Sequence, residues 1–317
     1  MAGVADVRFP NNPDIINDIY TFSPPFSWFI QWDSFLYIKI ADQGYLSHDI
    51  LTVFFPLLPL LIRGLTYFIN NLAIAGLFVS QTALLWTGYL IVRLVKLDFS
   101  QKIAYRCWIF LLIFPASIFL SSIYTESLFL MNAVAAIYFM RIGKVGYAGF
   151  FGGLLACTRQ PGIFILLPLL IEYFHSKKWK ISNVKKDIFW LTLVPAGLVC
   201  YLFYLYVQFG NPFYFISIEH DVFNRQISWN ILSTFWNHIS FQNSISTIIW
   251  PARELIIALI FLVSAIWTAW KIRLSYGIYA LLMLFPPLLS GTLDSMNRYV
   301  LIVFPVFILF AVWGERE

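Results

Sequence analysis

The chain has 317 residues, of which 60% are hydrophobic, 19% are aromatic and only 12% are charged. Soluble domains carry about 25% charged residues, so this composition excludes a water-soluble globular domain and indicates an integral membrane protein that crosses the bilayer several times. The net charge of +5 does not indicate nucleic-acid binding, because the largest basic cluster lies between two apolar segments. That cluster consists of Lys177, Lys178, Lys180, Lys185 and Lys186.

The first 50 residues are predicted to form an extracytoplasmic loop that carries the candidate catalytic residue. Residues 1–31 hold three aspartates and four prolines and lack the basic start and apolar run of a cleavable signal peptide. Asp33 follows Trp32, and aromatic residues are typical of the membrane–water boundary. A partly buried carboxylate has a raised pKa and can serve as a general base. The structural alternative for Asp33 is a solvated loop acid or a helix cap.

Two more charged residues follow in the same stretch. Lys39 is a candidate for holding an anionic group of a substrate, or its aliphatic stem lets it reach the lipid headgroups. Asp42 either assists Asp33 or caps the turn that Gly44 permits. Both are candidate substrate-binding residues with a structural alternative.

Residues 51–69 are apolar enough to cross the bilayer, but only two residues separate them from the next apolar run. Pro56 and Pro59 favour a bent, shallow helix in the membrane interface over a spanning helix. The interfacial position puts Asp33 outside the cell, whereas a spanning helix would put it in the cytoplasm. The interfacial prediction also requires a spanning helix upstream of this sequence.

Residues 72–313 are predicted to form one all-α transmembrane bundle, with about 9–10 spanning helices and additional juxtamembrane helices. The segments with the length and hydropathy of a span are 72–93, 103–122, 127–142, 188–208, 254–271, 275–290 and 299–313. Two shorter apolar runs, 145–158 and 162–174, flank the sequence TRQPG, where a proline interrupts the helix.

Lysines and arginines at the segment ends determine the expected orientation, because cytoplasmic loops carry an excess of both. The basic residues within 93–106, 141–144, 177–186 and 271–273 are then cytoplasmic. The opposite side receives a long loop, residues 209–253, together with the polar residues considered next.

Ionisable side chains near the hydrocarbon core are costly, so each is a candidate for function. Glu126 follows Tyr124 at a predicted helix start, where stabilising the helix terminus is the stronger interpretation and a substrate contact the weaker. Arg159 lies at the helix break, and Arg298 with Tyr299 lies at the outer end of the last helix. Each arginine is a candidate phosphate ligand, with an interfacial anchor as the alternative.

No pattern typical of a metal or nucleotide site stands out. The sequence EHD at 219–221 is a weak metal signal, because no second cluster follows at ligand spacing. The motifs GxGxxG, Walker A, HExxH and CxxC do not occur. We therefore assign no metal ligand, and metal dependence stays open. Cys107, Cys157 and Cys200 lie in apolar stretches and indicate small buried hydrophobic residues.

Five motifs occur in order along the chain: WDSFLYIKIADQGY, FFPLLPLLIR, FPASIFLSSIYTESLF, CTRQPG and NRYVLIVFP. Together they resemble the PIG-V-like family of GPI mannosyltransferases and its prokaryotic relatives, which belong to the membrane-embedded glycosyltransferases of the C superfamily. The resemblance extends from about Trp32 to Pro305. It implies an inverting hexosyltransferase that takes its sugar from a polyprenyl phosphate, typically dolichyl-phosphate mannose.

The resemblance also implies roles for individual residues. The family's Trp-Asp motif falls on Trp32 and Asp33, so Asp33 is expected to be the essential acid. The other motif positions, all expected to contact substrate, are Arg159, Arg298, Tyr299, Tyr124 and Glu126. The family begins with a spanning helix before the outer loop, and none is visible in residues 1–31, so we expect such a helix upstream.

The expected partners are the bilayer, a polyprenyl-phosphate sugar, and a lipid, glycan or protein acceptor, with no nucleic acid and no certain cofactor. The resemblance implies a multi-pass protein of the cell membrane in a prokaryote, or of the endoplasmic reticulum membrane in a eukaryote. Its site is expected on the extracytoplasmic or luminal side. A non-catalytic lipid-binding or transport protein and a silent assembly partner are the alternatives.

Overall fold

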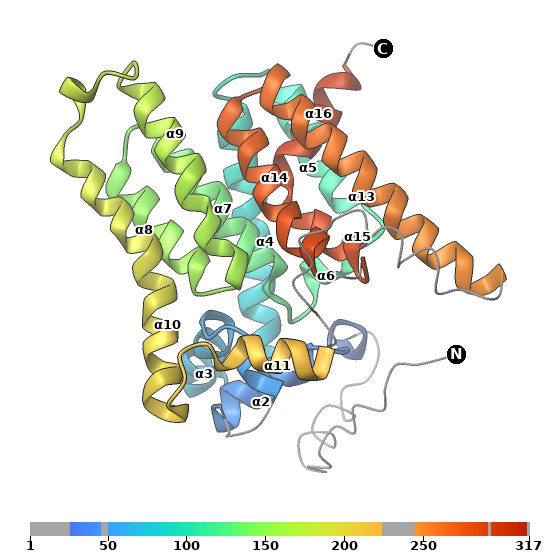
Figure 1. Cartoon of the computed structure of the whole chain (residues 1–317). Coiled ribbons are helices and arrows are strands. Elements are labelled where there is room, and N and C mark those ends of the chain that lie inside the picture. Colours follow the sequence, from blue (N-terminus) through green and yellow to red (C-terminus); the bar gives the residue numbers. More distant parts are fainter. Residues whose placement is uncertain (1–25, 46–49, 224–244, 291–292, 316–317) are drawn as a thin grey trace.

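The computed structural model describes residues 26–45, 50–223, 245–290 and 293–315, and within these ranges every regular element is a helix (Figure 1). The larger helices of the bundle are α4 (Leu72–Val95), α5 (Gln101–Leu112), α7 (Thr125–Arg141), α8 (Val145–Ala156), α9 (Leu166–Ser176), α10 (Leu193–Phe209), α13 (Ile245–Lys271), α14 (Leu274–Leu289) and α16 (Phe304–Trp313). The other elements are η1 (Phe26–Phe29), α2 (Ser34–Gln43), η2 (Ile50–Val53), α3 (Leu57–Ile69), α6 (Ile118–Ser121), η3 (Gln160–Ile165), η4 (Ile181–Asn183), η5 (Lys186–Thr192), α11 (Tyr214–Phe223), α15 (Met296–Tyr299) and η6 (Val300–Ile302).

Three helices of the described chain are long and apolar enough to cross a bilayer, namely α4, the combined η5 and α10, and Ala252–Lys271 within α13. A fourth candidate is a pair of helices, Met296–Ile302 and Phe304–Trp313, that bend by 82° at their junction. The fold is an all-α polytopic membrane fold, as predicted. Several predicted spans are nevertheless shorter or broken helices, so the bundle is less regular than a count of apolar segments indicated.

Prolines account for several of these breaks, because proline lacks an N–H donor and clashes with the preceding helical turn. Pro115 lies in a turn between α5 and α6, so the prediction of one continuous helix over 103–122 is wrong. Pro161 lies in the first turn of η3, where the break was predicted. Pro305 lies at the start of α16, directly after the bend at Val303.

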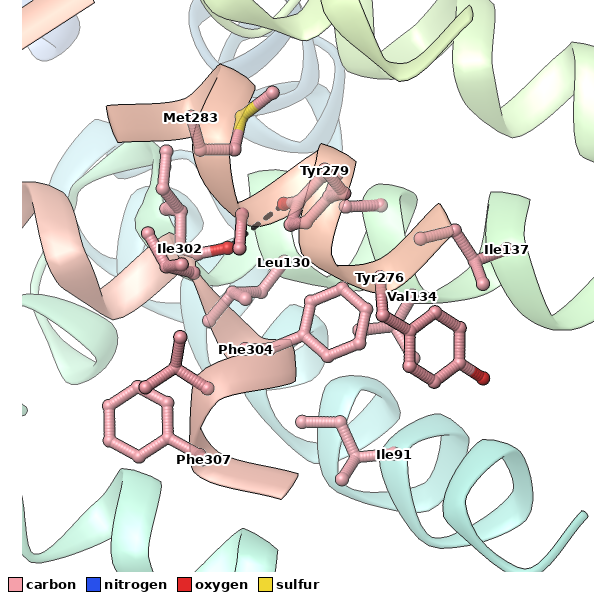
Figure 2. Close-up of a cluster of buried hydrophobic side chains, with 14 of the residues drawn as sticks. Ile91, Leu130, Val134, Ile137, Tyr276, Tyr279, Met283, Ile302, Phe304 and Phe307 are labelled. Carbon is pink, nitrogen blue, oxygen red and sulfur yellow. Dashed lines mark hydrogen bonds between the residues drawn. The ribbon is translucent and has the colours of Figure 1, made fainter. Parts of the chain in front are cut away.

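A buried aromatic cluster surrounds the bend before α16 (Figure 2). Phe304, Phe307 and Tyr279 are each at most 2% exposed. The Tyr279 hydroxyl donates to the carbonyl oxygen of Ile302 at 2.9 Å, which gives a partner to a backbone acceptor at the broken helix. These contacts hold the bend in place. They thereby fix the position of Arg298, which lies four residues before Ile302.

Glycines let the backbones of α8, α10 and η3 approach closely, as small residues commonly do between membrane helices. A Cβ atom on Gly197 of α10 would lie 2.2 Å from the carbonyl oxygen of Gly153 in α8. A Cβ atom on Gly162 of η3 would lie 2.3 Å from the carbonyl oxygen of Leu155. The η3 segment is therefore packed directly on the end of α8, and the intervening residue Arg159 is held between them.

The helix α2 and the lysine-rich segment 177–186 lie at opposite ends of the bundle. In Figure 1, α2, α3 and α11 lie at the lower end, whereas the connection from α9 to α10 and the end of α16 lie at the upper end. The start of α2 is therefore far from the connection between α9 and α10, which contains the lysine-rich residues 177–186. The side of the membrane that each end faces stays a prediction.

An ion-pair cluster joins four segments at the lysine-rich end. Arg141 at the end of α7 donates to both carboxylate oxygens of Asp98, at 2.7 Å each. Arg273 pairs with Glu172 on α9, and the Glu172 carboxylate also lies 3.9 Å from Nε of Arg141. Although burial opposes it, the hydrogen bond and charge of Arg141 hold the pKa of Asp98 below its ordinary value. The two arginines thus connect these segments through ion pairs. From the sequence alone, both had indicated only the orientation in the membrane.

The helix α3 lies within the segment whose placement the sequence left open, residues 51–69. It has 13 residues and a length of about 20 Å, which is shorter than a hydrocarbon core of about 30 Å. Leu58 and Ile62 are fully buried, whereas Tyr67 and Phe68 are 82% and 86% exposed. A short helix with one buried side favours the interfacial prediction over the spanning one.

The predicted loop 209–253 contains helix at both of its ends, α11 and the beginning of α13. The helix α11 is held by Phe215, which is buried against Phe55 with ring centroids 5.8 Å apart. Residues 224–244 of this predicted loop, and residues 1–25 of the predicted N-terminal loop, lie outside the described residues.

Candidate active site

A cavity of about 810 Å³ lies at the end of the bundle that carries α2 and α11. Its wall is formed by residues of α2, η2, η3, α11, α14 and α15, which are far apart in the sequence. The charged side chains in the wall are Asp33, Arg159, Glu219 and Arg298. The predicted catalytic acid and both predicted phosphate ligands therefore line one cavity.

Asp33 directly precedes α2, and its carboxylate contacts Arg298 instead of capping the helix. Its Oδ2 accepts a hydrogen bond from Nη1 of Arg298 at 2.6 Å, and no side chain caps α2. Tyr124 fixes the backbone here, because its hydroxyl accepts from the Asp33 N–H at 3.1 Å and donates to the carbonyl of Gln31 at 3.2 Å. The Asp33 side chain is 31% exposed, so a molecule in the cavity can reach it.

Arg298, on α15, joins two carboxylates that come from distant parts of the chain. Its Nη1 donates to Asp33 and its Nε donates to Glu126. The guanidinium carbon lies 4.4 Å from the centre of the Tyr124 ring and 5.3 Å from that of Phe119. Two ion pairs and two aromatic faces hold the guanidinium group in one orientation. One edge of the group still faces the cavity.

Arg159 lies in extended backbone between α8 and η3, next to the same carboxylate. Its Nη1 donates to Oε1 of Glu126 at 3.1 Å, and its guanidinium carbon lies 5.8 Å from the centre of the Tyr299 ring. The side chain is only 16% exposed, and that of Arg298 only 12%. An interfacial anchor would extend toward water and headgroups, so this burial argues against the anchor interpretation of both arginines.

Glu126 lies in the first turn of α7 and is fully buried. Its Oε1 accepts from both Arg159 and Arg298. Glu126 is an acid in the first helical turn, as predicted, and its contacts with two arginines add to that role. Tyr124 precedes the helix without a side-chain cap, while Thr125 contacts the Tyr37 hydroxyl at 3.4 Å. The carboxylate of Glu126 is the shared hydrogen-bond acceptor of the two arginines.

The cavity has an apolar side as well as a charged side. Its apolar wall includes Phe54 and Phe55 after η2, Phe164 of η3, and Phe285 with Pro286 in α14. Burial raises the pKa of Tyr37, also in the wall, to about 12, so this hydroxyl stays protonated and can donate or accept a hydrogen bond near neutral pH. The cavity can therefore hold a molecule with an anionic group and a long apolar part.

Five residues predicted to contact substrate do not line this cavity, namely Trp32, Lys39, Asp42, Tyr124 and Glu126. Trp32 is 62% exposed and packs on Phe119 with ring centroids 5.9 Å apart. Lys39 and Asp42 lie on α2 but are not part of the cavity wall, and Asp42 is exposed. Tyr124 also lies behind the wall, where it supports Asp33 and Arg298.

Tyr37 and Glu219 are among the residues of the wall that sequence reasoning missed. Tyr37 follows Asp33 by four positions, a spacing that places both on one side of a helix, so the pattern could have indicated it. Glu219 was considered only as part of a weak metal motif, and α11, which carries it, was not predicted. Within the described residues, no group of three or more His, Cys, Asp and Glu could hold a metal ion.

A membrane bundle with a carboxylate, two arginines and apolar side chains in one cavity can bind a molecule that carries an anionic group. The sequence matches the family model described as mannosyltransferase (PIG-V) over residues 7–213, and the chain belongs to this family. The matched range contains Asp33, Glu126 and Arg159 and ends before Arg298. The predicted resemblance is confirmed.

The chain is also similar to a solved structure, the crystal structure of ArnT from Cupriavidus metallidurans bound to undecaprenyl phosphate. The TM-score is 0.58 at 16% sequence identity, and the match covers 89% of this chain and 54% of ArnT. The chain thus spans about half the length of ArnT. At this identity the match shows a shared fold, and it confirms the predicted all-α polytopic membrane bundle. A search of curated proteins found no match.

Proposed function

We propose that this protein transfers a sugar from a polyprenyl phosphate to an acceptor hydroxyl with inversion at the anomeric carbon. The proposed sugar is mannose. The observation that carries the proposal is the meeting of Asp33, Arg159 and Arg298 in one cavity with an apolar side. Membership of the mannosyltransferase (PIG-V) family supports the sugar, and the undecaprenyl phosphate bound to ArnT supports the lipid class.

Arg159 and Arg298 bind the phosphate of the donor. Guanidinium groups present paired donors that match phosphate oxygens, and both side chains are largely removed from water, where such contacts are stronger. When the bond between the anomeric carbon and the phosphate oxygen breaks, the electron pair leaves with the phosphate. The two guanidinium groups compensate the charge that develops there.

Asp33 acts as the general base toward the acceptor. The acceptor oxygen forms a bond to the anomeric carbon on the face opposite the leaving phosphate, and its proton passes to the Asp33 carboxylate. The contact with Arg298 holds this carboxylate beside the phosphate site. A single base and a good leaving group suffice for one inverting displacement.

The polyprenyl chain of the donor lies along the apolar wall formed by Phe54, Phe164 and Phe285. An isoprenoid that packs against these rings buries apolar surface of both partners. This packing requires no specific polar contact. The acceptor is a lipid, a glycan or a protein and enters from the same end of the bundle as Asp33. This end faces the extracytoplasmic or luminal side, because the lysine-rich end faces the cytoplasm.

The test is a transfer assay with the purified full chain, labelled polyprenyl-phosphate sugars and a set of hydroxyl acceptors. The D33N variant should lose at least about 100-fold in kcat, the scale of one general base, while still binding the donor. The matched control is D294N, which changes an exposed aspartate outside the cavity wall. Full activity of D33N would remove Asp33 from the proposed role.

The same assay separates the alternatives. A lipid-binding or transport protein would bind the polyprenyl phosphate without releasing a glycosylated acceptor. A silent assembly partner would show neither activity until a second protein is added. Adding and chelating divalent cations in the wild-type assay measures metal dependence directly.

A further inference from the structure

The carboxylate of Glu126 lies in the site but not in the cavity. Arg159 and Arg298 are both part of the cavity wall, whereas Glu126 is not and is 0% exposed. Its Oε1 accepts hydrogen bonds from both guanidinium groups, so the carboxylate lies behind the two arginines as seen from the cavity. A substrate that fills the cavity can touch the arginines but cannot touch Glu126.

Hydrogen bonding alone does not account for a carboxylate at this position. Only Oε1 receives the two arginine bonds, and Oε2 is buried without a hydrogen-bond partner among the described residues. The amide oxygen of a glutamine could accept the same two bonds. Glutamine lacks only the negative charge of the carboxylate. Burying a charge costs free energy, so a buried carboxylate requires a compensating interaction or role.

Among the four ion-paired side chains the charges sum to zero, because Asp33 and Glu126 offset Arg159 and Arg298. Glu219 adds a further carboxylate to the cavity wall. The donor is a phosphate diester with one negative charge. The product is a phosphate monoester, which carries close to two negative charges near neutral pH, while Asp33 has taken up the acceptor proton. Without a second carboxylate, two guanidinium groups would face this dianion in a site of low dielectric and hold it tightly.

We propose that Glu126 is a positioning and charge-balancing residue, which aims Arg159 and Arg298 at the donor phosphate and limits their affinity for the polyprenyl phosphate product. The inference rests on the proposed function and deepens it. The buried carboxylate thus controls how readily the lipid phosphate dissociates from the protein, as well as how it leaves the sugar.

The test compares wild type with E126Q in lipid nanodiscs, using undecaprenyl phosphate as the probe. The glutamine keeps the acceptor oxygen and removes the charge. We expect E126Q to bind undecaprenyl phosphate roughly tenfold more tightly, because one nearby negative charge is gone. We also expect its kcat to fall, with added undecaprenyl phosphate inhibiting turnover at roughly tenfold lower concentration. Equal or weaker binding by E126Q would overturn the proposal.

Two further variants keep the result interpretable. N132A removes another fully buried polar side chain from α7, whose amide donates to the Leu128 carbonyl of the same helix. This variant should leave the affinity for undecaprenyl phosphate unchanged. If E126Q does not fold, E126D carries the test. It keeps the charge but shortens the side chain, so the affinity should stay within about threefold of wild type while kcat/KM for the donor falls about tenfold. Tighter binding by E126D would contradict charge balancing.

Failure of this inference is distinct from failure of the proposed function. A wild-type protein that neither binds undecaprenyl phosphate nor transfers a sugar would refute the function. A wild-type protein that does both, with an E126Q variant that binds the lipid phosphate no more tightly, would refute only the role of Glu126.

Discussion

Arg298 and Asp33 lie 265 positions apart in the chain, and their side chains meet at 2.6 Å. The contact joins the segment before the last bundle helix to the residue that directly precedes α2. It requires the bend before α16, which the buried cluster around Phe304 holds in place. The catalytic proposal therefore depends on the packing of α14 and α16 as much as on the site residues.

The first prediction concerns the fork of Arg298. Lysine offers a point charge on a flexible stem and cannot pair with Asp33, Glu126 and a phosphate at once. In the transfer assay we expect R298K to lose at least about 100-fold in kcat/KM, the scale of one lost donor to a developing anion. R63K, which changes an exposed arginine of α3, is the matched control. Equal kinetics for R298K and wild type would show that the fork is dispensable.

The second prediction concerns the hydroxyl of Tyr124, which bonds to the backbone on both sides of Trp32. Y124F removes the hydroxyl and keeps the ring under Arg298. Losing these bonds costs about 1–2 kcal/mol in the positioning of Asp33, so kcat should fall about tenfold while the donor KM changes less than about twofold. Steady-state kinetics check this, with Y206F on the outer face of α10 as control. A change in donor KM alone would place Tyr124 with the phosphate ligands instead.

The third prediction concerns the close contact of α8 and α10. A Cβ on Gly197 would lie 2.2 Å from the Gly153 carbonyl, a backbone atom that cannot move aside independently. We expect G197A to destabilise the protein by about 1–3 kcal/mol, the usual cost of overpacking. G64A on α3 meets no atom within 4 Å and should be neutral or slightly stabilising. Thermal unfolding in one detergent compares the two, and equal melting temperatures would show that the helices can separate without cost.

The fourth prediction concerns pH and the ion pair of Asp98 with Arg141. The folded protein holds the pKa of Asp98 below its ordinary value of about 3.9. The pair's contribution is therefore complete above the unfolded pKa and is lost as the pH falls through the folded pKa. Wild type should unfold at a higher temperature than D98N from pH 7 to about pH 5, and the difference should shrink below about pH 4 and vanish at lower pH. A difference that is the same at pH 7 and pH 3 would mean that the pair contributes nothing.

Some parts of this fold follow directly from the sequence. The apolar segments 72–93 and 127–142 correspond to α4 and α7 within two residues at each end. The helix break at Pro161 was predicted from proline chemistry. Local signals of this kind depend only on neighbouring residues, and for that reason they can be recognised in a single chain.

Other parts depend on contacts between distant residues, which no local pattern contains. The sequence placed Asp33, Arg159 and Arg298 on one side of the membrane but could not bring their side chains together. Glu126 resembled an ordinary acid at a helix start, because its two partners lie 33 and 172 positions away. The helix α11 was missed for a similar reason, since its stability comes from Phe215 packing on a distant segment.

The phenylalanine-lined wall of the cavity has a practical consequence for measuring affinity. An alkyl chain offers such rings much the same methylene surface as an isoprenoid does, so solubilising agents compete for this space in proportion to their concentration. Dissociation constants obtained in micelles should therefore rise with the amount of surfactant, whereas those in nanodiscs should depend on the dilution of the ligand among bilayer lipids.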